Sequence, residues 1–382
     1  MKTILRSLLP FDIEVNSNRI VFLQLNSEIL LQYKTKHINR MNKIYNYSII
    51  IVLSLAIISC GAGEKKTKAP ASTGDNLVDQ LTQQISDSPN NSELLFQRAT
   101  TLHEKEEYEA AIRDFTKAMS IDSLKPKYYH SLSDSYMDYF KSRKALDVME
   151  EAGRLFNENV PTLLKLSETQ MLLSQYENSV FTVNEILRLD PQNNEAYFML
   201  GMNFRAMGQL DKAINSFQTA VENDPEMVDA WLILGELHEK NGSADPMKYY
   251  KNALTISPDN PQVMHSMAFH LQNNGDIPGA LKLYKEISAK NRQYIDAYLN
   301  AGILYIEQDS LEQAFEQMNI LAGVQPENPF AYYYRGVIHK AYGNYEAAET
   351  DLQNAVNLQP LFTQAKEELA VVKTLAQENK QG

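Results

Sequence analysis

Apolar and polar residues follow the spacing of amphipathic helices along most of this chain, and the pattern recurs about every 34 residues. The clearest stretch is residues 194–227, where Tyr197, Leu200 and Phe204 form one helical stripe and Phe217 belongs to a second. A glycine separates the two stripes and a proline follows the second. The pattern therefore predicts pairs of helices joined by a tight turn.

The period appears independently in three kinds of residue. Prolines follow such pairs at the same interval, at an interval shorter by one, or at twice the interval: Pro191, Pro225, Pro258, Pro326 and Pro360. Small residues recur in the same rhythm at Ala111, Ala145, Ser179, Ala213, Ala280, Ala314 and Ala348. A bulky residue stands one helical turn after each of them: Phe115, Met149, Val183, Phe217, Tyr284, Met318 and Leu352. Small residues let two helices approach closely, and the bulky residues fill the space between pairs.

Eight copies of the pattern cover residues 92–362, beginning at Ser92, Pro126, Val160, Asn194, Val228, Pro261, Ile295 and Pro329. Their residues resemble the tetratricopeptide repeat. The resemblance implies an all-α fold, a right-handed superhelical solenoid of about eight helix-turn-helix repeats with a concave face. Residues 75–91 are expected to hold a leading helix, and residues 363–382 a capping helix and tail. In the fifth copy, Asp245-Pro246 predicts a second helix that starts late, with aspartate as its N-cap.

The N-terminal part of the chain has a different character. An apolar run from Ser48 to Ser59 ends directly at Cys60, the only cysteine. This run is shorter than the roughly 20 residues of a membrane span but suits the core of a signal peptide. From Met41 onward the segment resembles a bacterial lipoprotein signal, which implies that Cys60 is lipidated. We therefore expect residues 1–40 to be a non-native upstream extension, 41–59 a signal peptide and 60–74 a flexible tether. The alternative is a signal anchor, with residues 1–40 as a cytoplasmic tail.

Composition and motifs restrict the function. The net charge of −12 argues against a nucleic-acid binder, because such a protein needs a basic surface to neutralise phosphates. No phosphate-binding glycine loop, nucleophile motif or metal-ligand spacing is present in the sequence, so we expect no enzyme activity, no cofactor and no metal. Histidines such as His238 and His339 occupy positions at which neighbouring copies carry an aromatic residue. They are predicted to pack in the core.

Partner binding is expected along the groove that the first helix of each repeat lines in this family. The expected groove positions carry eleven acidic and four basic residues over the eight copies, a net charge of −7. Two apolar patches interrupt the charges: Leu164, Met171, Leu172, Phe198 and Met202 form one, and Leu299, Ile303, Ile306, Phe330, Tyr333 and Val337 form the other. A basic or apolar segment of a partner protein is the predicted ligand. Some of these apolar residues could instead pack under neighbouring helices.

These observations predict a non-catalytic scaffold or adaptor that is anchored by lipid in the bacterial outer membrane and faces the periplasm. Two alternatives stay open at this stage. One is a periplasmic carrier or chaperone of export clients, and the other is a substrate-presenting subunit of an envelope enzyme complex.

Overall fold

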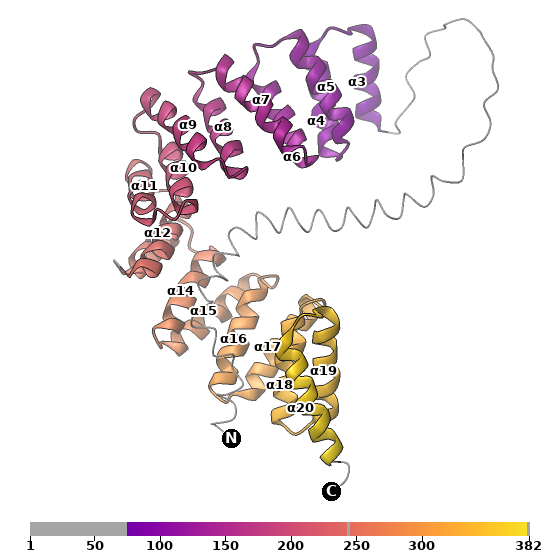
Figure 1. The fold of residues 1–382 in the computed structure, drawn as a ribbon, viewed down its shortest axis with the longest axis vertical. Helices are drawn as coiled ribbons and strands as arrows, with labels where there is room; N and C mark the ends of the chain where they lie inside the picture. Colours follow the sequence, from indigo (N-terminus) through magenta and orange to yellow (C-terminus); the bar gives the residue numbers. More distant parts are fainter. Residues whose placement is uncertain (1–74, 243–244, 380–382) are drawn as a thin grey trace, which may run out of the picture. The chain divides into compact units, whose positions relative to one another are not determined.

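The computed structural model describes residues 75–242 and 245–379, and these residues form helices joined by short turns (Figure 1). The predictions about the extension, the signal peptide, the lipidated Cys60 and the tether therefore lie outside the described residues. The described chain divides into an N-terminal unit that ends at Leu283 and a C-terminal unit that begins at Tyr284. Each unit is built from antiparallel helix pairs, and the predicted all-α helix-turn-helix fold is confirmed.

The helices alternate between first and second members of a pair. The first helices are α4 (Ser92–Glu104), α6 (Pro126–Asp138), α8 (Val160–Leu172), α10 (Asn194–Ala206), α12 (Val228–Asn241), α14 (Pro261–Asn273), α16 (Ile295–Glu307) and α18 (Pro329–Ala341). The second helices are α5 (Tyr108–Ile121), α7 (Ser142–Leu155), α9 (Tyr176–Leu189), α11 (Leu210–Asn223), α13 (Pro246–Ile256), α15 (Ile277–Lys290), α17 (Leu311–Val324) and α19 (Tyr345–Leu358). The first helices begin at the residues where the eight sequence copies begin. Two further helices, α3 (Asn76–Asp87) and α20 (Thr363–Asn379), precede and follow the pairs.

Side-chain caps fix the start of most first helices. Asn91, Asn159, Asn193, Asn260 and Asn328 each accept hydrogen bonds from backbone N–H groups of the first turn that follows. Such a cap contributes about 1 kcal/mol, because the first N–H groups of a helix have no partner within the helix. The short second helix of the fifth copy also has a cap, because Asp245 accepts from the backbone N–H of Met247. As predicted, this helix begins at Pro246.

The turn inside each pair needs one residue in the left-handed region, fifteenth in its copy. Four copies have glycine there: Gly208, Gly242, Gly275 and Gly343, with φ between 61° and 83°. The other four have Glu106, Phe140, Ser174 and Asp309, with φ between 58° and 62°. A side chain in this conformation costs about 1–2 kcal/mol, because Cβ crowds the backbone carbonyl. Half of the turns therefore carry backbone strain.

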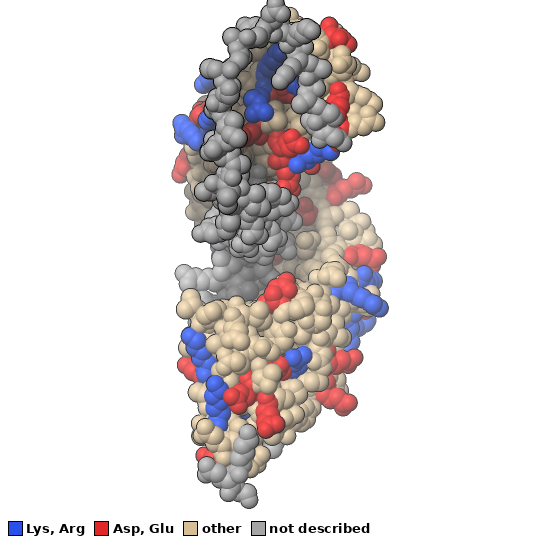
Figure 2. Space-filling model, turned by 90° about the vertical axis from the view of Figure 1, so that its right-hand side faces the viewer, with Lys and Arg blue, Asp and Glu red and all other residues tan. Residues whose placement is uncertain are grey.

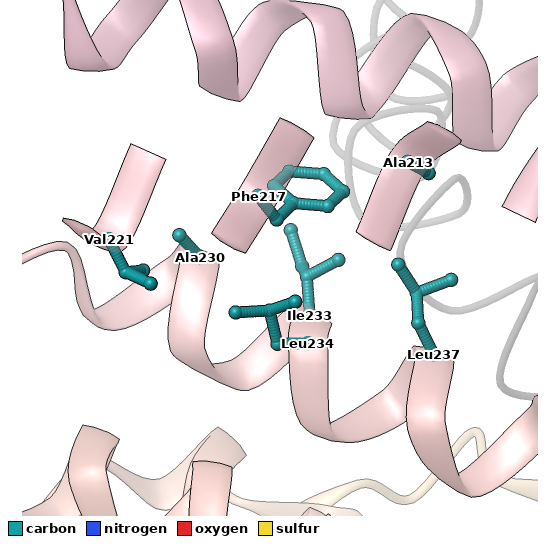
Figure 3. Close-up of a cluster of buried hydrophobic side chains, with 7 residues drawn as sticks. All are labelled: Ala213, Phe217, Val221, Ala230, Ile233, Leu234 and Leu237. Carbon is teal, nitrogen blue, oxygen red and sulfur yellow. The ribbon is translucent and has the colours of Figure 1, made fainter. Parts of the chain in front are cut away.

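Close approach within each pair depends on the small residue of the first helix. A Cβ atom on Gly201 would lie 2.7 Å from the ring of Phe217, and one on Gly336 would lie 2.8 Å from Leu352. Successive pairs then stack through shared apolar clusters. In one of them, Ala213, Phe217 and Val221 of α11 meet Ala230, Ile233, Leu234 and Leu237 of α12 (Figure 3). Neither pair could bury these side chains alone, so neighbouring repeats stabilise each other.

Helix α20 occupies the position of one more first helix, because Thr363 follows Pro329 at the interval that separates successive copies. Its inner face, with Ala365, Leu369 and Val372, is buried, and it packs against α19 and α18. Phe362, just before this helix, is also buried. This arrangement closes the apolar end of the eighth pair.

Candidate partner-binding groove

Neighbouring first helices contact each other within each unit, so their equivalent positions form a strip of side chains. In the N-terminal unit the contacting pairs are α4 with α6, α6 with α8, α8 with α10 and α12 with α14. In the C-terminal unit α16 contacts α18, and α18 contacts α20. The expected groove residues stand on these helices. Their burial and charge decide what each strip can bind.

Ion pairs connect successive first helices across the strip. Lys127 on α6 contacts Glu93 on α4 at 2.9 Å, and Lys165 on α8 contacts Asp134 on α6 at 2.8 Å. Lys165 also lies 3.1 Å from Glu168, one turn further along its own helix. The hydrogen bond from Lys127 lowers the pKa of Glu93. These acidic groups are therefore already neutralised by the protein itself.

A more buried pair links α10 to α12. Arg205 donates to Glu236 at 3.2 Å, and both side chains are nearly buried. Burial raises the pKa of Glu236 although Arg205 opposes the shift. One turn later Glu239 accepts a hydrogen bond from the hydroxyl of Tyr250 and lies 3.5 Å from His270. Both carboxylates are paired with residues of the same chain. They therefore stabilise contacts between helices and are less available to bind a ligand.

Lys127 and Arg205 are already included in the count of −7, and Lys165 changes it to −6. Glu104, Glu195 and Asp229 are exposed groove acids that have no ion-pair partner in the part of the chain that the structure describes. Figure 2 shows the same mixture on a larger scale, with acidic and basic side chains interspersed over the described surface in view. Lys165 was not among the expected groove residues, because these are the second, fifth, ninth, twelfth and thirteenth residues of each copy and Lys165 is the sixth of its copy. Its spacing from Glu168 was the available signal.

The expected apolar patch of the N-terminal unit lies on α8 and α10. Leu164, Met171, Phe198 and Met202 are half-buried, and Leu172 is 39% exposed. Phe198 rests edge-on against the buried Phe217, with ring centroids 5.4 Å apart. The structure thus brings all five residues to two adjacent first helices, with part of each accessible. Accessible apolar groups on neighbouring helices are typical of a protein-binding surface.

The expected patch of the C-terminal unit is smaller than predicted. Ile306, Tyr333 and Val337 are only 4%, 4% and 5% exposed, so they are core residues and the prediction that they line a binding surface is wrong. Tyr333 is covered by Phe362, whose ring centroid lies 4.9 Å away. Leu299 and Ile303 are half-buried, and Phe330 is 39% exposed, edge-on to Phe362 at 5.2 Å.

The histidines that were expected to pack do so. His238 is buried and stacks on Tyr249, with ring centroids 4.6 Å apart, and burial lowers its pKa. His339 lies edge-on to Phe315 at 5.0 Å and 3.7 Å from Asp351. Within the described residues, no three His, Cys, Asp or Glu side chains are arranged to hold a metal ion. The helices of the described chain also include none with the length and apolar character needed to span a membrane.

Comparison with known families agrees with this architecture. The family model of the tetratricopeptide repeat matches residues 92–123, which are the first helix pair, and residues 198–261 in the fourth and fifth. The chain carries tetratricopeptide repeats. This repeat architecture is consistent with a scaffold that binds protein partners or peptides.

Relatives with such repeats are distant and longer. BBSome complex member BBS4 of Bos taurus is 26% identical over 235 residues, which are 61% of this chain and 45% of that protein. The TPR repeat-containing protein YpiA of Bacillus subtilis is 24% identical over 242 residues, 62% of this chain and 56% of that protein. The chain spans about half the length of the curated relatives it matches.

Similar helical arrays occur in solved structures. The Cut9 and Hcn1 hetero-tetramer of the APC/C matches 77% of this chain and 58% of its own chain, with 17% identity and a TM-score of 0.47. YrrB, a TPR protein with an unusual peptide-binding site, matches 50% of this chain and 98% of its own, with 24% identity and a TM-score of 0.39.

Proposed function

We propose that this protein is a non-catalytic scaffold or adaptor that binds a partner protein along the first helices of its N-terminal unit. The observation that carries the proposal is the apolar patch on α8 and α10, where five apolar groove residues remain accessible beside paired charges. Two of the five are methionines, whose unbranched side chains adapt to different ligand shapes. The unpaired Glu195 stands on the same helix as Phe198 and Met202, one turn before Phe198. An apolar segment that carries a basic residue therefore suits this surface.

The test compares variants that change the accessible atoms and leave the core intact. Met171→Ser with Leu172→Ser removes two groove side chains from the end of α8, while Leu124→Ser, at a residue that is 77% exposed and lies off the groove, is the matched control. Recovery of a stoichiometric partner should fall by about tenfold or more in the groove variant and stay unchanged in the control, at equal helicity and melting temperature. Equal recovery by all three proteins would contradict the groove proposal.

We also propose that Cys60 is lipidated and holds the chain at the outer membrane on its periplasmic side. A short apolar run that ends directly at the only cysteine supports this proposal. Wild-type protein should incorporate labelled fatty acid and partition into detergent, and Cys60→Ala should do neither. Equal labelling of both proteins would exclude Cys60 as the site. This test does not depend on the groove, so either proposal can fail alone.

The methionines of the patch also support a second candidate function, a carrier of several export clients. Crosslinking from the groove distinguishes the two functions. An adaptor should crosslink to one stoichiometric partner, whereas a carrier should crosslink to many proteins through the same residues.

A further inference from the structure

A cavity of about 450 Å³ lies between the second and third helix pairs, on the opposite side of α8 from the groove. Its floor is formed by Leu163, Leu166 and Gln170 of α8. Its walls come from α7, with Glu150, Gly153 and Arg154, from the turn after α7, with Asn157, and from α9, with Phe181, Thr182, Glu185 and Arg188. At 3.6 residues per turn, the floor residues point about 150° away from Leu164, Glu168, Met171 and Leu172. The cavity is therefore separate from the proposed groove.

The lining of the cavity departs from the repeat pattern in three ways. Where α7 has Gly153, the equivalent second-helix residues of neighbouring copies are Met119, Leu187 and Val221. A Cβ atom on Gly153 would lie 2.7 Å from Leu166, so the glycine lets this α8 side chain pack directly against the backbone of α7. Any of the larger side chains would collide with Leu166 in its present position. The close contact of α7 with α8 beside the cavity is thus specific to this pair of repeats.

The second departure is an exposed aromatic residue at the rim. Phe181 is 67% exposed. The equivalent residues of the neighbouring copies are Arg113, Asp147 and Asn215, all polar. A phenyl ring at a position that is otherwise solvated offers apolar area to a ligand beside the opening.

The third departure is a buried amide with hydrogen-bonding capacity to spare. Gln170 is only 6% exposed and replaces the apolar Leu102, Tyr136 and Phe204 of other copies. Its Oε1 accepts a hydrogen bond from the hydroxyl of Thr182 at 2.8 Å. Its Nε2 group has no acceptor among the described residues and keeps some contact with solvent. A donor at this place, within reach of solvent, can bind a ligand that brings a carbonyl or carboxylate oxygen.

The two ends of the cavity differ in polarity. The hydrogen bond between Thr182 and Gln170 places the floor amide at the Phe181 end. Phe181 and Arg188 are seven residues apart on α9, which corresponds to about 10 Å, so Arg188 lies at the other end. Arg154 of α7 and Asn157 of the turn that follows line that end, and their side chains have no partner in the described chain, while Glu185 pairs with Arg188. An apolar end and an end with an unpaired guanidinium are thus about three extended residues apart.

We propose that this cavity binds a short extended segment of a partner protein, with a bulky apolar side chain beside Phe181 and an acidic side chain at Arg154. The main-chain carbonyl between them accepts a hydrogen bond from Gln170. Arginine suits the acidic end, because its planar guanidinium can hold a carboxylate through two hydrogen bonds. The scaffold would then hold two partners, one on each side of α8.

The probe is a capped, fluorescein-labelled heptapeptide, Asp-Ser-Ser-Leu-Ser-Ser-Asp, in which an aspartate stands three residues from leucine in either direction. Binding to the full chain is followed by fluorescence anisotropy into the millimolar range. Phe181→Asn copies a residue of the neighbouring repeat, and Arg154→Ala removes the unpaired cation. Both residues are exposed, so neither change should disturb folding. Leu155→Ser and Arg143→Ala are matched controls on α7, at exposed residues outside the cavity.

We expect saturable binding to the wild type, a loss of about tenfold or more in each cavity variant, and no loss in either control. Binding should also survive Leu172→Ser, which changes only the groove. A lysine-flanked peptide that binds as well as the acidic one would overturn the proposal, as would an acidic peptide that does not saturate. Loss of binding in Leu172→Ser but not in Phe181→Asn would assign the peptide to the groove and overturn the proposal too.

Discussion

Replacing Glu106 by glycine should stabilise the N-terminal unit, although it removes a charged side chain and adds a flexible residue. Glu106 has a φ of 62° in the turn between α4 and α5, where other copies have glycine. Its side chain is exposed and makes no hydrogen bond or ion pair in the described structure. Only the backbone conformation therefore decides the result.

The magnitude follows from two opposing free energies. Relief of the left-handed conformation is worth about 1–2 kcal/mol. The greater entropy of glycine in the unfolded chain lowers the stability by about 0.5–1 kcal/mol. The net gain is about 0.5–1 kcal/mol, and Ser174→Gly, at a φ of 59° in the third copy, should add a similar amount.

Urea unfolding followed by circular dichroism measures the gain, and hydrogen exchange of α4 and α5 locates it. The reverse change, Gly208→Ala, is the matched control. A Cβ atom there would meet nothing within 4 Å, so its cost reports the backbone alone and should be about 1 kcal/mol. If Glu106→Gly leaves the midpoint unchanged or lowers it while Gly208→Ala destabilises, the assigned strain at residue 106 does not exist.

Three further predictions concern packing and titration. Gly235→Ala should lower the free energy of unfolding in urea by about 1–3 kcal/mol, because its Cβ would overlap the buried ring of Tyr250. Gly323→Ala, with open space around it, should be neutral or slightly stabilising. Equal effects of the two changes would contradict the close approach of α12 to α13 at Gly235. In thermal unfolding, Tyr333→Ser should destabilise the C-terminal unit by about 3 kcal/mol and Phe330→Ser by less than about 1 kcal/mol, because only the tyrosine is buried. The reverse order would mean that Tyr333 is accessible to a partner, as the sequence predicted. Burial lowers the pKa of His265 to about 4 from its ordinary 6.5, so the unfolded chain binds a proton that the folded chain does not, and stability should fall by about 1–3 kcal/mol as pH drops from 6.5 to 4. The variant His265→Gln should lose this part of the pH dependence, and an unchanged profile would refute the assignment.

The sequence predicted the helix pairs well because their determinants are local. The spacing of Gly201, Ala213 and Phe217 reflects a contact within one pair, and the same spacing recurs in every copy except the fifth, where Gly235 and Tyr250 are one residue closer. The late start of α13 followed in the same way from Asp245 and Pro246. Each of these features depends on residues that are close together in the sequence.

The sequence did not predict features that depend on neighbouring repeats. Tyr333 has the spacing of a groove residue, but Phe362, from the segment after the eighth pair, covers it. The charge of the groove was overestimated because Lys165, one residue outside the expected positions, pairs with Asp134 of the preceding repeat. The cavity beside Gly153 needs three helices at once. Its lining residues run from Glu150 to Arg188 across two copies, so the spacing within one copy does not reveal it.

The ion pairs between first helices also determine how fast a partner can be captured. A groove with seven uncompensated negative charges would steer a basic ligand over long distances and raise its association rate by orders of magnitude at low salt. That net charge already subtracts Lys127 and Arg205, and Lys165 lowers it by only one, so a basic segment is still attracted but must displace these cations from the acids they pair with. Association should then exceed the unsteered range of about 10⁵–10⁶ M⁻¹s⁻¹ at low salt and slow as ionic strength rises. Discrimination between partners would appear in the rate of dissociation, which the apolar contacts of α8 and α10 control.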